Sequence, residues 1–177
     1  MEIRKVSTSY WKHFKPHYYL DLPMPPAAEY FIGTVEGELV CHLAVCPFFT
    51  ANAYRATRLV VMPEWQGAGV GTKFLEWICE YHKNGLGRCA RKLPTLFHTS
   101  HPQLIAFLQR SGNWVLKSQQ MFGGNKNKSK KSINGAHKLK PLPSYAHANG
   151  GIGSGQASAG YGGHFRAVQG YKYIGTK

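Results

Sequence analysis

The sequence predicts a mixed α/β (α+β) fold in which helices flank a β-sheet. Two β-prone runs within residues 29–49 are separated by a Glu-Gly pair, as in a hairpin. A β-branched strand then leads through a glycine-rich turn into an amphipathic helix, and a further strand, helix and two late strands follow. The chain has 177 residues, 43% of them apolar, so we expect residues 1–177 to form a single domain with its own core.

The N-terminal part predicts short helical pieces before the sheet. Trp11, Phe14 and Tyr18 recur at helical spacing, but Pro16 limits any helix there to short segments. The following run, DLPMPPAA, contains three prolines, which a sheet interior does not tolerate, and is therefore predicted to be a connector. The hairpin comes next, with EYFIGTV and LVCHLAVCPFF as its two strands.

A central strand and a helix are predicted around a glycine-rich turn. Residues 55–62 (RATRLVVM) end in a continuous apolar run, which is typical of a strand buried on both faces. Pro63 ends this strand, and Gly85 ends the helix that follows. The helix is predicted from an apolar stripe at Val70, Phe74, Leu75, Trp77 and Ile78.

The C-terminal part predicts another strand and helix and then two strands. Residues 93–99 form the strand, Ser100 is the expected N-cap, and Pro102 fits the first turn of the helix. Residues 114–122 and 164–174 alternate well enough to be the late strands.

A long segment at residues 123–163 separates these late strands. It contains ten of the twenty glycines and six lysines, with almost no large apolar side chains. Such a composition cannot bury enough surface to offset the entropy of ordering, so we expect a flexible, basic insertion in a hairpin. A loop of this length inside a compact domain indicates a functional role.

The charge distribution and the lengths of the apolar runs narrow the expected partners and location of the protein. Residues 1–80 hold seven basic and eight acidic side chains, whereas residues 81–177 hold fifteen basic ones and no Asp or Glu. Such a basic half favours anionic partners. The start, MEIRK, shows no export signal, and the longest mostly apolar stretch, residues 39–49, is too short for a membrane span and contains His42. We therefore expect a cytoplasmic protein with no membrane partner.

The four cysteines and nine histidines do not predict a metal site. No C-x-x-C pair and no H-E-x-x-H motif is present, so we expect reduced thiols and no bound metal.

The turn at residues 66–72 (QGAGVGT) carries the chemistry. It follows a buried strand and opens a helix, where unpaired main-chain N–H groups and the helix dipole favour an anion such as a pyrophosphate. The spacing of its glycines fits neither a P-loop nor a dinucleotide-binding motif. From the residues alone, a glycine turn that only packs helix against strand remains an alternative.

Gln66-Gly67-Ala68-Gly69-Val70-Gly71 resembles the acyl-CoA motif Q/R-x-x-G-x-G/A of the GCN5-related N-acetyltransferase (GNAT) superfamily, and the order of elements from about residue 28 to 175 is also similar. The resemblance implies a mostly antiparallel sheet whose two central parallel strands are splayed by a β-bulge, with acetyl-CoA as co-substrate in the resulting acyl-CoA cleft. The residues that it assigns to acetyl-CoA are Val60, Val61, Met62, Gln66, Gly67, Ala68, Gly69, Val70, Gly71 and Thr72. A main-chain N–H near Val60 or Val61 would polarise the thioester carbonyl.

The catalytic groups are less defined, because the sequence departs from the family pattern. Leu108 stands where many members carry a tyrosine that can protonate the leaving thiolate, and residues 55–62 contain no carboxylate to act as base. His98 and His101 are the nearest titratable candidates for deprotonating an amine. Structural roles for both histidines, and loss of the proton to water, stay open as alternatives.

The function that follows is an acetyl-CoA-dependent N-acetyltransferase acting on a primary amine by direct attack in a ternary complex. One alternative is a non-enzymatic nucleic-acid-binding protein, and another is an acetyltransferase whose acceptor is carried on RNA or on a ribosome-associated protein. The lysines within residues 126–140 make an anionic acceptor or a nucleic acid the expected partner. A homodimer is compatible with the sequence.

Overall fold

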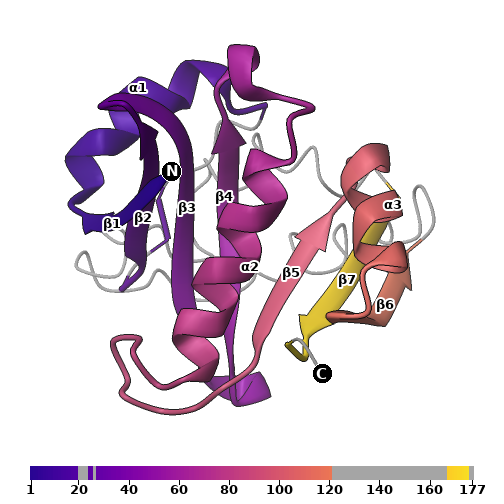
Figure 1. Cartoon of the computed structure of the whole chain (residues 1–177). Coiled ribbons are helices and arrows are strands. Elements are labelled where there is room, and N and C mark those ends of the chain that lie inside the picture. The colour runs from indigo at the N-terminus through magenta and orange to yellow at the C-terminus, as the bar shows by residue number, and fades with distance from the viewer. Residues whose placement is uncertain (20–23, 26, 121–166, 176–177) are drawn as a thin grey trace, which may run out of the picture. The chain divides into compact units, whose positions relative to one another are not determined.

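The computed structural model describes residues 1–19, 24–25, 27–120 and 167–175 (Figure 1). Contacts divide the chain into one unit of Met1–Tyr19, Met24–Ser118 and Gln169–Lys177 and a second of Leu20–Pro23 and Gln119–Val168, most of which lies outside the described residues. The insertion expected at residues 123–163 also lies outside them, so its flexibility and the single-domain organisation stay predictions.

The described residues form a seven-stranded sheet in the order β1-β2-β3-β4-β5-β7-β6. β4 and β5 pair in parallel, whereas β1 to β4 and the pair β5 and β7 are antiparallel, which confirms the predicted mixed, mostly antiparallel sheet. The strands are β1 Glu2–Val6, β2 Glu29–Val35, β3 Glu38–Phe48, β4 Ala53–Val61, β5 Thr95–Thr99, β6 Trp114–Gln120 and β7 Val168–Tyr173. The α-helices are α1 Trp11–Phe14, α2 Val70–Lys83 and α3 Pro102–Arg110, and the 3₁₀ turns are η1 Thr8–Tyr10, η2 Lys15–His17, η3 Phe49–Ala51 and η4 Pro63–Trp65.

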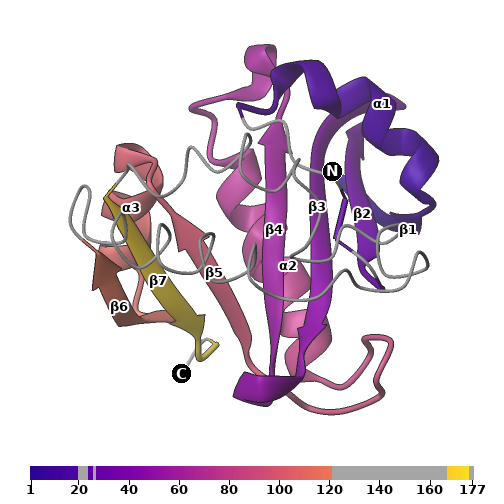
Figure 2. The ribbon, with the colours of Figure 1, turned by 180° about the vertical axis from the view of Figure 1, so that it is seen from behind.

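Helices cover both faces of the sheet. α2 and α3 lie on one face, and α1 lies on the other (Figures 1 and 2). The larger core lies under α2 and α3 and includes Phe31, Phe74 and Leu108, while Trp11, Phe14, Ile32 and Val60 form a smaller core under α1. Because side chains alternate along a strand, neighbouring residues of β2 such as Phe31 and Ile32 enter different cores.

The predicted hairpin of β2 and β3 is confirmed. Its two-residue loop, Glu36-Gly37, has φ values of 50° and 85°, and two positive φ angles in succession are typical of a type I′ turn, whose twist matches that of the strands. The short helical pieces predicted before the hairpin are confirmed too, since η1, α1 and η2 are each three or four residues long, although the unpredicted β1 precedes them.

Three details differ from the sequence analysis. β1 was not predicted, because its five residues, EIRKV, are mostly charged and carry no turn signal. The N-cap of α3 is His101 instead of Ser100, and its N–H donates to Thr99 Oγ1 at 3.0 Å. Trp77 is 47% exposed and stacks on Tyr81 with ring centroids 5.8 Å apart, so it does not belong to the buried stripe of α2.

No helix of the described residues is long and apolar enough to cross a bilayer. The four cysteines are all free, Cys41 and Cys79 being buried and Cys46 and Cys89 half-buried.

Glu76 on α2 ties this helix to the turn between α3 and β6. Its Oε1 accepts hydrogen bonds from Ser111 Oγ at 3.1 Å, Asn113 Nδ2 at 3.2 Å and Trp114 Nε1 at 3.0 Å. Trp114 also packs edge-on against Tyr173 of β7, with centroids 5.1 Å apart. One carboxylate therefore links α2 to the part of the sheet formed by β6 and β7.

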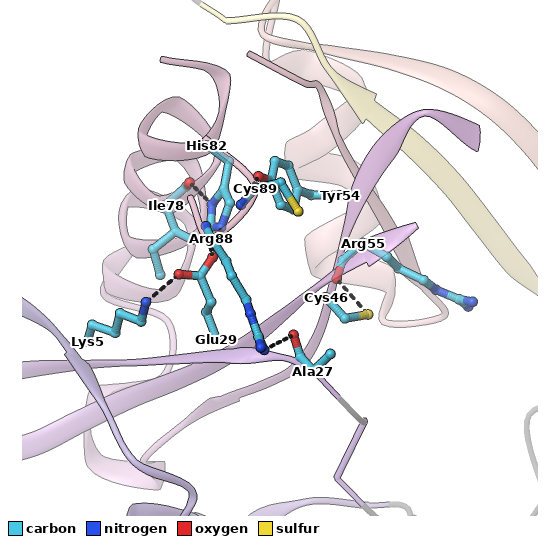
Figure 3. A network of polar contacts seen from close by, with 10 residues as sticks. All are labelled: Lys5, Ala27, Glu29, Cys46, Tyr54, Arg55, Ile78, His82, Arg88 and Cys89. Atoms are coloured by element: carbon cyan, nitrogen blue, oxygen red, sulfur yellow. Dashed lines mark hydrogen bonds and ion pairs between the residues drawn. The ribbon is translucent and has the colours of Figure 1, made fainter. Parts of the chain in front are cut away.

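A buried carboxylate, Glu29, joins four parts of the chain near the C-terminal end of α2 (Figure 3). It is 3% exposed and accepts hydrogen bonds from Lys5 Nζ at 2.5 Å, His82 Nε2 at 3.2 Å and Arg88 N at 2.8 Å. His82 also donates from Nδ1 to Ile78 O at 2.8 Å, so both of its ring nitrogens face oxygen. Burial alone would raise the pKa of the Glu29 carboxyl, but the hydrogen bonds from His82, Lys5 and Arg88 outweigh it and lower the pKa to about 2.

We expect Glu29→Gln to lower the free energy of unfolding by about 3 kcal/mol at neutral pH, because it leaves the buried donors without their carboxylate. A carboxyl whose folded pKa is about 2, against 4.5 as the ordinary value, stabilises the fold fully above pH 4.5 and loses that effect as the pH falls towards 2. The difference between wild type and variant in urea unfolding should therefore shrink over this window. Glu38→Gln, at an exposed strand end, is the control; a pH-independent difference for Glu29→Gln would contradict the assignment.

Candidate functional site

The glycine-rich turn between β4 and α2 has the geometry that the sequence predicts. Gly67 and Gly69 have φ values of 84° and 74°, in the left-handed region that L-residues with a side chain rarely adopt, and Gly69 is the N-cap of α2. A Cβ atom built on either glycine would have no atom within 4 Å. The turn, with Ala68 also exposed, therefore presents bare backbone to solvent.

The first turn of α2 leaves main-chain donors for a ligand. The first helical bond runs from Lys73 N to Gly69 O at 3.2 Å, so within the helix the N–H groups of Val70, Gly71 and Thr72 have no acceptor four residues earlier. Thr72 Oγ1 donates to Gly69 O at 2.8 Å and closes the turn. With the positive end of the helix dipole and the exposed Lys73 beside them, these amides can bind a phosphate group.

Two residues of the motif fix the turn against the strand. Gln66 Nε2 donates to Val61 O at 3.0 Å, and a Cβ atom on Gly71 would lie 2.6 Å from Val61 Cγ2. Gln66 and Gly71 thus set the position of the helix N-terminus relative to β4, and their contact with a ligand stays a prediction.

β4 and β5 separate after only three residue pairs. The parallel pairs are Tyr54 with Thr95, Arg55 with Leu96 and Ala56 with Phe97. Beyond them β4 continues beside β3, while β5 continues beside β7. We call the region between β4 residues 57–61 and β5 residues 98–99 the β4–β5 fork; the two strands diverge there in both views (Figures 1 and 2).

A β-bulge at Arg58 accompanies this divergence, as expected from the family resemblance. The register between β3 and β4 shifts between the pairs Ala44–Thr57 and His42–Val60, and Arg58 has a φ of 57°. A non-glycine residue in this conformation costs about 1–2 kcal/mol, so other contacts must hold it. Its guanidinium lies over the ring of Tyr18, 5.5 Å from the centroid.

His42 is the second contact that holds the bulge. Its Nδ1 donates to the carbonyl oxygen of Arg58 at 3.2 Å, and its ring is fully buried between Trp11 and Phe14, at centroid distances of 5.0 and 5.2 Å. Burial lowers the pKa of His42 to about 4, so the ring is neutral at pH 7 with its hydrogen on Nδ1. In the sequence, His42 stands out only as a polar residue within the apolar stretch 39–49, and that interruption is the signal for this role.

The main chain at the end of β4 alternates between β3 and the fork. Met62 N donates to Val40 O at 2.9 Å, so this group faces β3. Since successive peptide groups of a strand point to opposite sides, Val60 also faces β3, whereas the N–H and C=O of Val61 face the fork. Of the three residues assigned to acetyl-CoA on this strand, Val61 is therefore the one whose main-chain N–H is directed into the fork.

His98 lies on the face of the sheet opposite α2. Its neighbour Phe97 enters the core under α2, so the His98 side chain leaves the other face. A Cβ atom on Gly170 of β7 would lie 2.7 Å from His98 Nε2 and 2.4 Å from Ser118 Oγ, so both side chains meet above Gly170. Partial desolvation, and to a lesser extent the charge of Arg55, lower the pKa of His98, which favours the neutral ring.

The other candidates take structural positions. His101 caps α3 through its main chain, and its side chain is exposed. Leu108, at the position of the absent tyrosine, is fully buried in the core. Among the described residues, no group of three or more His, Cys, Asp or Glu side chains could hold a metal ion.

Comparisons with known proteins agree with this geometry. The profile of the acetyltransferase (GNAT) domain family matches residues 26–112, which include the turn and both strands of the fork. No curated protein sequence is significantly similar to the chain.

Solved structures of acetyltransferases share the fold at low identity. The IAA acetyltransferase from Bacillus cereus ATCC 14579 has a TM-score of 0.59 at 13% identity, and the alignment covers 97% of each chain. The ribosomal-protein-S18-alanine N-acetyltransferase from Escherichia coli has 0.57 at 12%, covering 99% of this chain and 95% of that one. A putative streptothricin acetyltransferase from Bacillus anthracis str. Ames, solved in complex with acetyl coenzyme A, has 0.55 at 12%, covering 99% and 97%.

We expect His42→Phe to lower the free energy of unfolding by about 1–3 kcal/mol, because it keeps the aromatic packing but leaves the Arg58 carbonyl without its donor. Amide hydrogen exchange should accelerate first at Leu59 to Val61, next to the bulge. Phe14→Leu is the matched control, since it trims the same aromatic cluster and spares the hydrogen bond. A loss of protection spread evenly over the sheet would argue against a specific role for His42.

Proposed function

Residues 26–112 form an acetyltransferase domain of the GNAT superfamily, and on that premise we propose that the protein transfers the acetyl group of acetyl-CoA to a primary amine. The transfer takes place by direct attack of the amine in a ternary complex, without a covalent enzyme intermediate. The observation that carries the proposal is the junction of two features: the bare glycine turn at the start of α2 and the β4–β5 fork beside it.

The residues present fit acetyl-CoA as co-substrate. The exposed turn of Gly67, Ala68 and Gly69, with the unbonded amides of α2, suits its pyrophosphate. The pantetheine arm then follows the edge of β4 that faces the fork, which brings the thioester to the Val61 N–H. Ligand pairing with a free strand edge is a common mode of recognition.

Polarisation of the thioester is assigned to the main chain. As the amine nitrogen bonds to the carbonyl carbon, negative charge develops on the thioester oxygen, and a fixed N–H stabilises that charge without reorganising. The Val61 N–H is the group directed into the fork that can do this.

His98 is the proposed base. An alkylamine is protonated at neutral pH and must lose a proton before or during attack. The lowered pKa of His98 keeps its ring neutral and able to accept this proton, while its position on β5 places it beside the fork. His101 remains a weaker candidate because the structure shows its contribution only through the helix cap.

The absent tyrosine does not prevent the reaction. Breaking the C–S bond releases the CoA thiolate, and a thiol has a pKa of about 8.5. Such a leaving group is stable enough to depart and take a proton from water, so Leu108 can serve the core instead.

Partners beyond acetyl-CoA are proposed on the sequence alone. The lysines within residues 126–140, which lie outside the described residues, would attract an anionic acceptor, or a nucleic acid that carries it. Cytoplasmic location and a homodimer stay predictions.

The proposed cradle is tested by adding a charge to it. Ala68→Glu introduces a carboxylate on the exposed turn, so repulsion of the pyrophosphate should weaken acetyl-CoA binding at least tenfold in calorimetry. Ala68→Gln, of equal size and no charge, should bind considerably more tightly than Ala68→Glu. Equal affinities for the two folded variants would show that the turn does not face the pyrophosphate.

The proposed base is tested by pH-rate profiles. His98→Gln should lower kcat by about 10²-fold, measured with a primary amine that the wild type acetylates. Because the pKa of His98 is lowered from 6.5, the wild-type rate should fall on the acid side below pH 6.5 as the ring becomes protonated, and this component should vanish in the variant. An unchanged profile would favour proton loss to water.

A further inference from the structure

A row of residues crosses four strands on the face of the sheet opposite α2. Cys46 of β3 pairs with Arg55 of β4, Arg55 with Leu96 of β5, and Leu96 with Lys172 of β7. The residues next to them in sequence, such as Tyr54, enter the core under α2, so the row itself faces the other way. Two cations, Arg55 and Lys172, therefore flank Leu96 on the face that also carries His98.

Arg55 lies at the base of the β4–β5 fork. The pair after it, Ala56 with Phe97, is the last before the strands separate. Its guanidinium lies over the Phe48 ring, 5.9 Å from the centroid, and its side chain extends away from the Glu29 network (Figure 3). The exposed guanidinium is also close enough to His98 to contribute to the lowering of that pKa.

No carboxylate of the described residues balances these cations. Arg55 and Lys172 form no ion pair there. The described carboxylate on the same face of the sheet, Glu2, is on β1, three strands from β4, so it lies at least about 14 Å away. The other described carboxylates lie in the buried network, on the hairpin loop, at the start of β3, after β4 and on α2: Glu29, Glu36, Glu38, Glu64, Glu76 and Glu80.

Such a surface disfavours an amine whose only charge is positive. An ammonium group approaching the fork from this face would be repelled by Arg55 and Lys172 together. An acceptor that carries an anion beside its amine would be attracted instead, and arginine is the side chain suited to bidentate binding of a carboxylate or phosphate. Arg55 pairs with Leu96, and Leu96 and His98 are two residues apart on β5, about 7 Å. A small molecule can therefore reach Arg55 and His98 at once.

We infer that the acceptor is a small primary amine bearing a carboxylate or phosphate group, which Arg55 binds while the amine lies at the fork beside His98. This inference rests on the proposed acetyl transfer and names the substrate class of that same site. Lys172 adds to the attraction without fixing orientation.

Two matched pairs of amines test the inference: β-alanine against β-alaninamide, and O-phosphoethanolamine against ethanolamine. The quantity measured is kcat/KM for the anionic member divided by kcat/KM for the neutral member. For the wild type this ratio should exceed one in at least one pair. Arg55→Gln should lower this ratio at least tenfold while leaving the affinity for acetyl-CoA unchanged. Comparing the same ratio between variants cancels the intrinsic reactivity of each amine, and the pair that responds distinguishes carboxylate from phosphate.

Arg91→Gln is the matched control. Arg91 is an exposed arginine that does not belong to the row, and it donates to Asn52 Oδ1 at 2.9 Å. Arg55→Lys should retain part of the preference. Should no probe be acetylated, calorimetric binding of the four amines to the CoA-saturated protein supplies the same ratio.

An unchanged ratio in Arg55→Gln, or binding of neither anionic amine, would overturn the inference and leave the acetyltransferase proposal standing. Failure of the wild type to bind acetyl-CoA would overturn both.

Discussion

The bulge at Arg58 is the constraint on which the site depends. β4 has to remain paired with β3 up to Val61 and yet leave β5 after Ala56. One extra residue in β4 meets both requirements, because a bulge bends and twists one strand of an antiparallel pair. The free-energy cost of the left-handed backbone at Arg58 is offset by the hydrogen bond from His42 and by the Tyr18 ring, both on the face opposite α2. The short segment around α1, which supplies that aromatic packing, is therefore part of the site although it lies far from it in sequence.

The two faces of the sheet have different tasks. Under α2 and α3 the side chains form a continuous apolar core, closed at one end by the buried Glu29 network. On the opposite face, beyond the small α1 core, the strands around the fork present Arg55, His98 and Lys172. Each of these strands thus anchors the fold with every second residue and leaves the residues between them outside that core.

Much of this architecture was readable from the chain, because it depends on local patterns. The glycine spacing at 67–71 and the four-residue repeat of α2 predict the turn and the helix that it opens without any long-range information. The contact of His42 with the bulge and the place of Arg55 at the base of the fork were not readable. They depend on which residues of β3, β4 and β5 stand in register and on which face, and a bulge changes that alternation. The N-cap of α3 was misplaced by one residue because Ser100 and His101 both precede Pro102, and local preference favours serine.

The hydrogen bonds of Glu76 have a mechanical consequence. Only three residue pairs join β4 to β5, so the sheet by itself offers little resistance to bending along that line. α2 starts at the end of β4 and is fastened by Glu76 to Ser111, Asn113 and Trp114, across the same line. The helix therefore acts as a brace between the two halves of the sheet, and the angle between them is set by helix packing. Braced in this way, the β4–β5 fork can keep a fixed width although no hydrogen bonds join its two strands there.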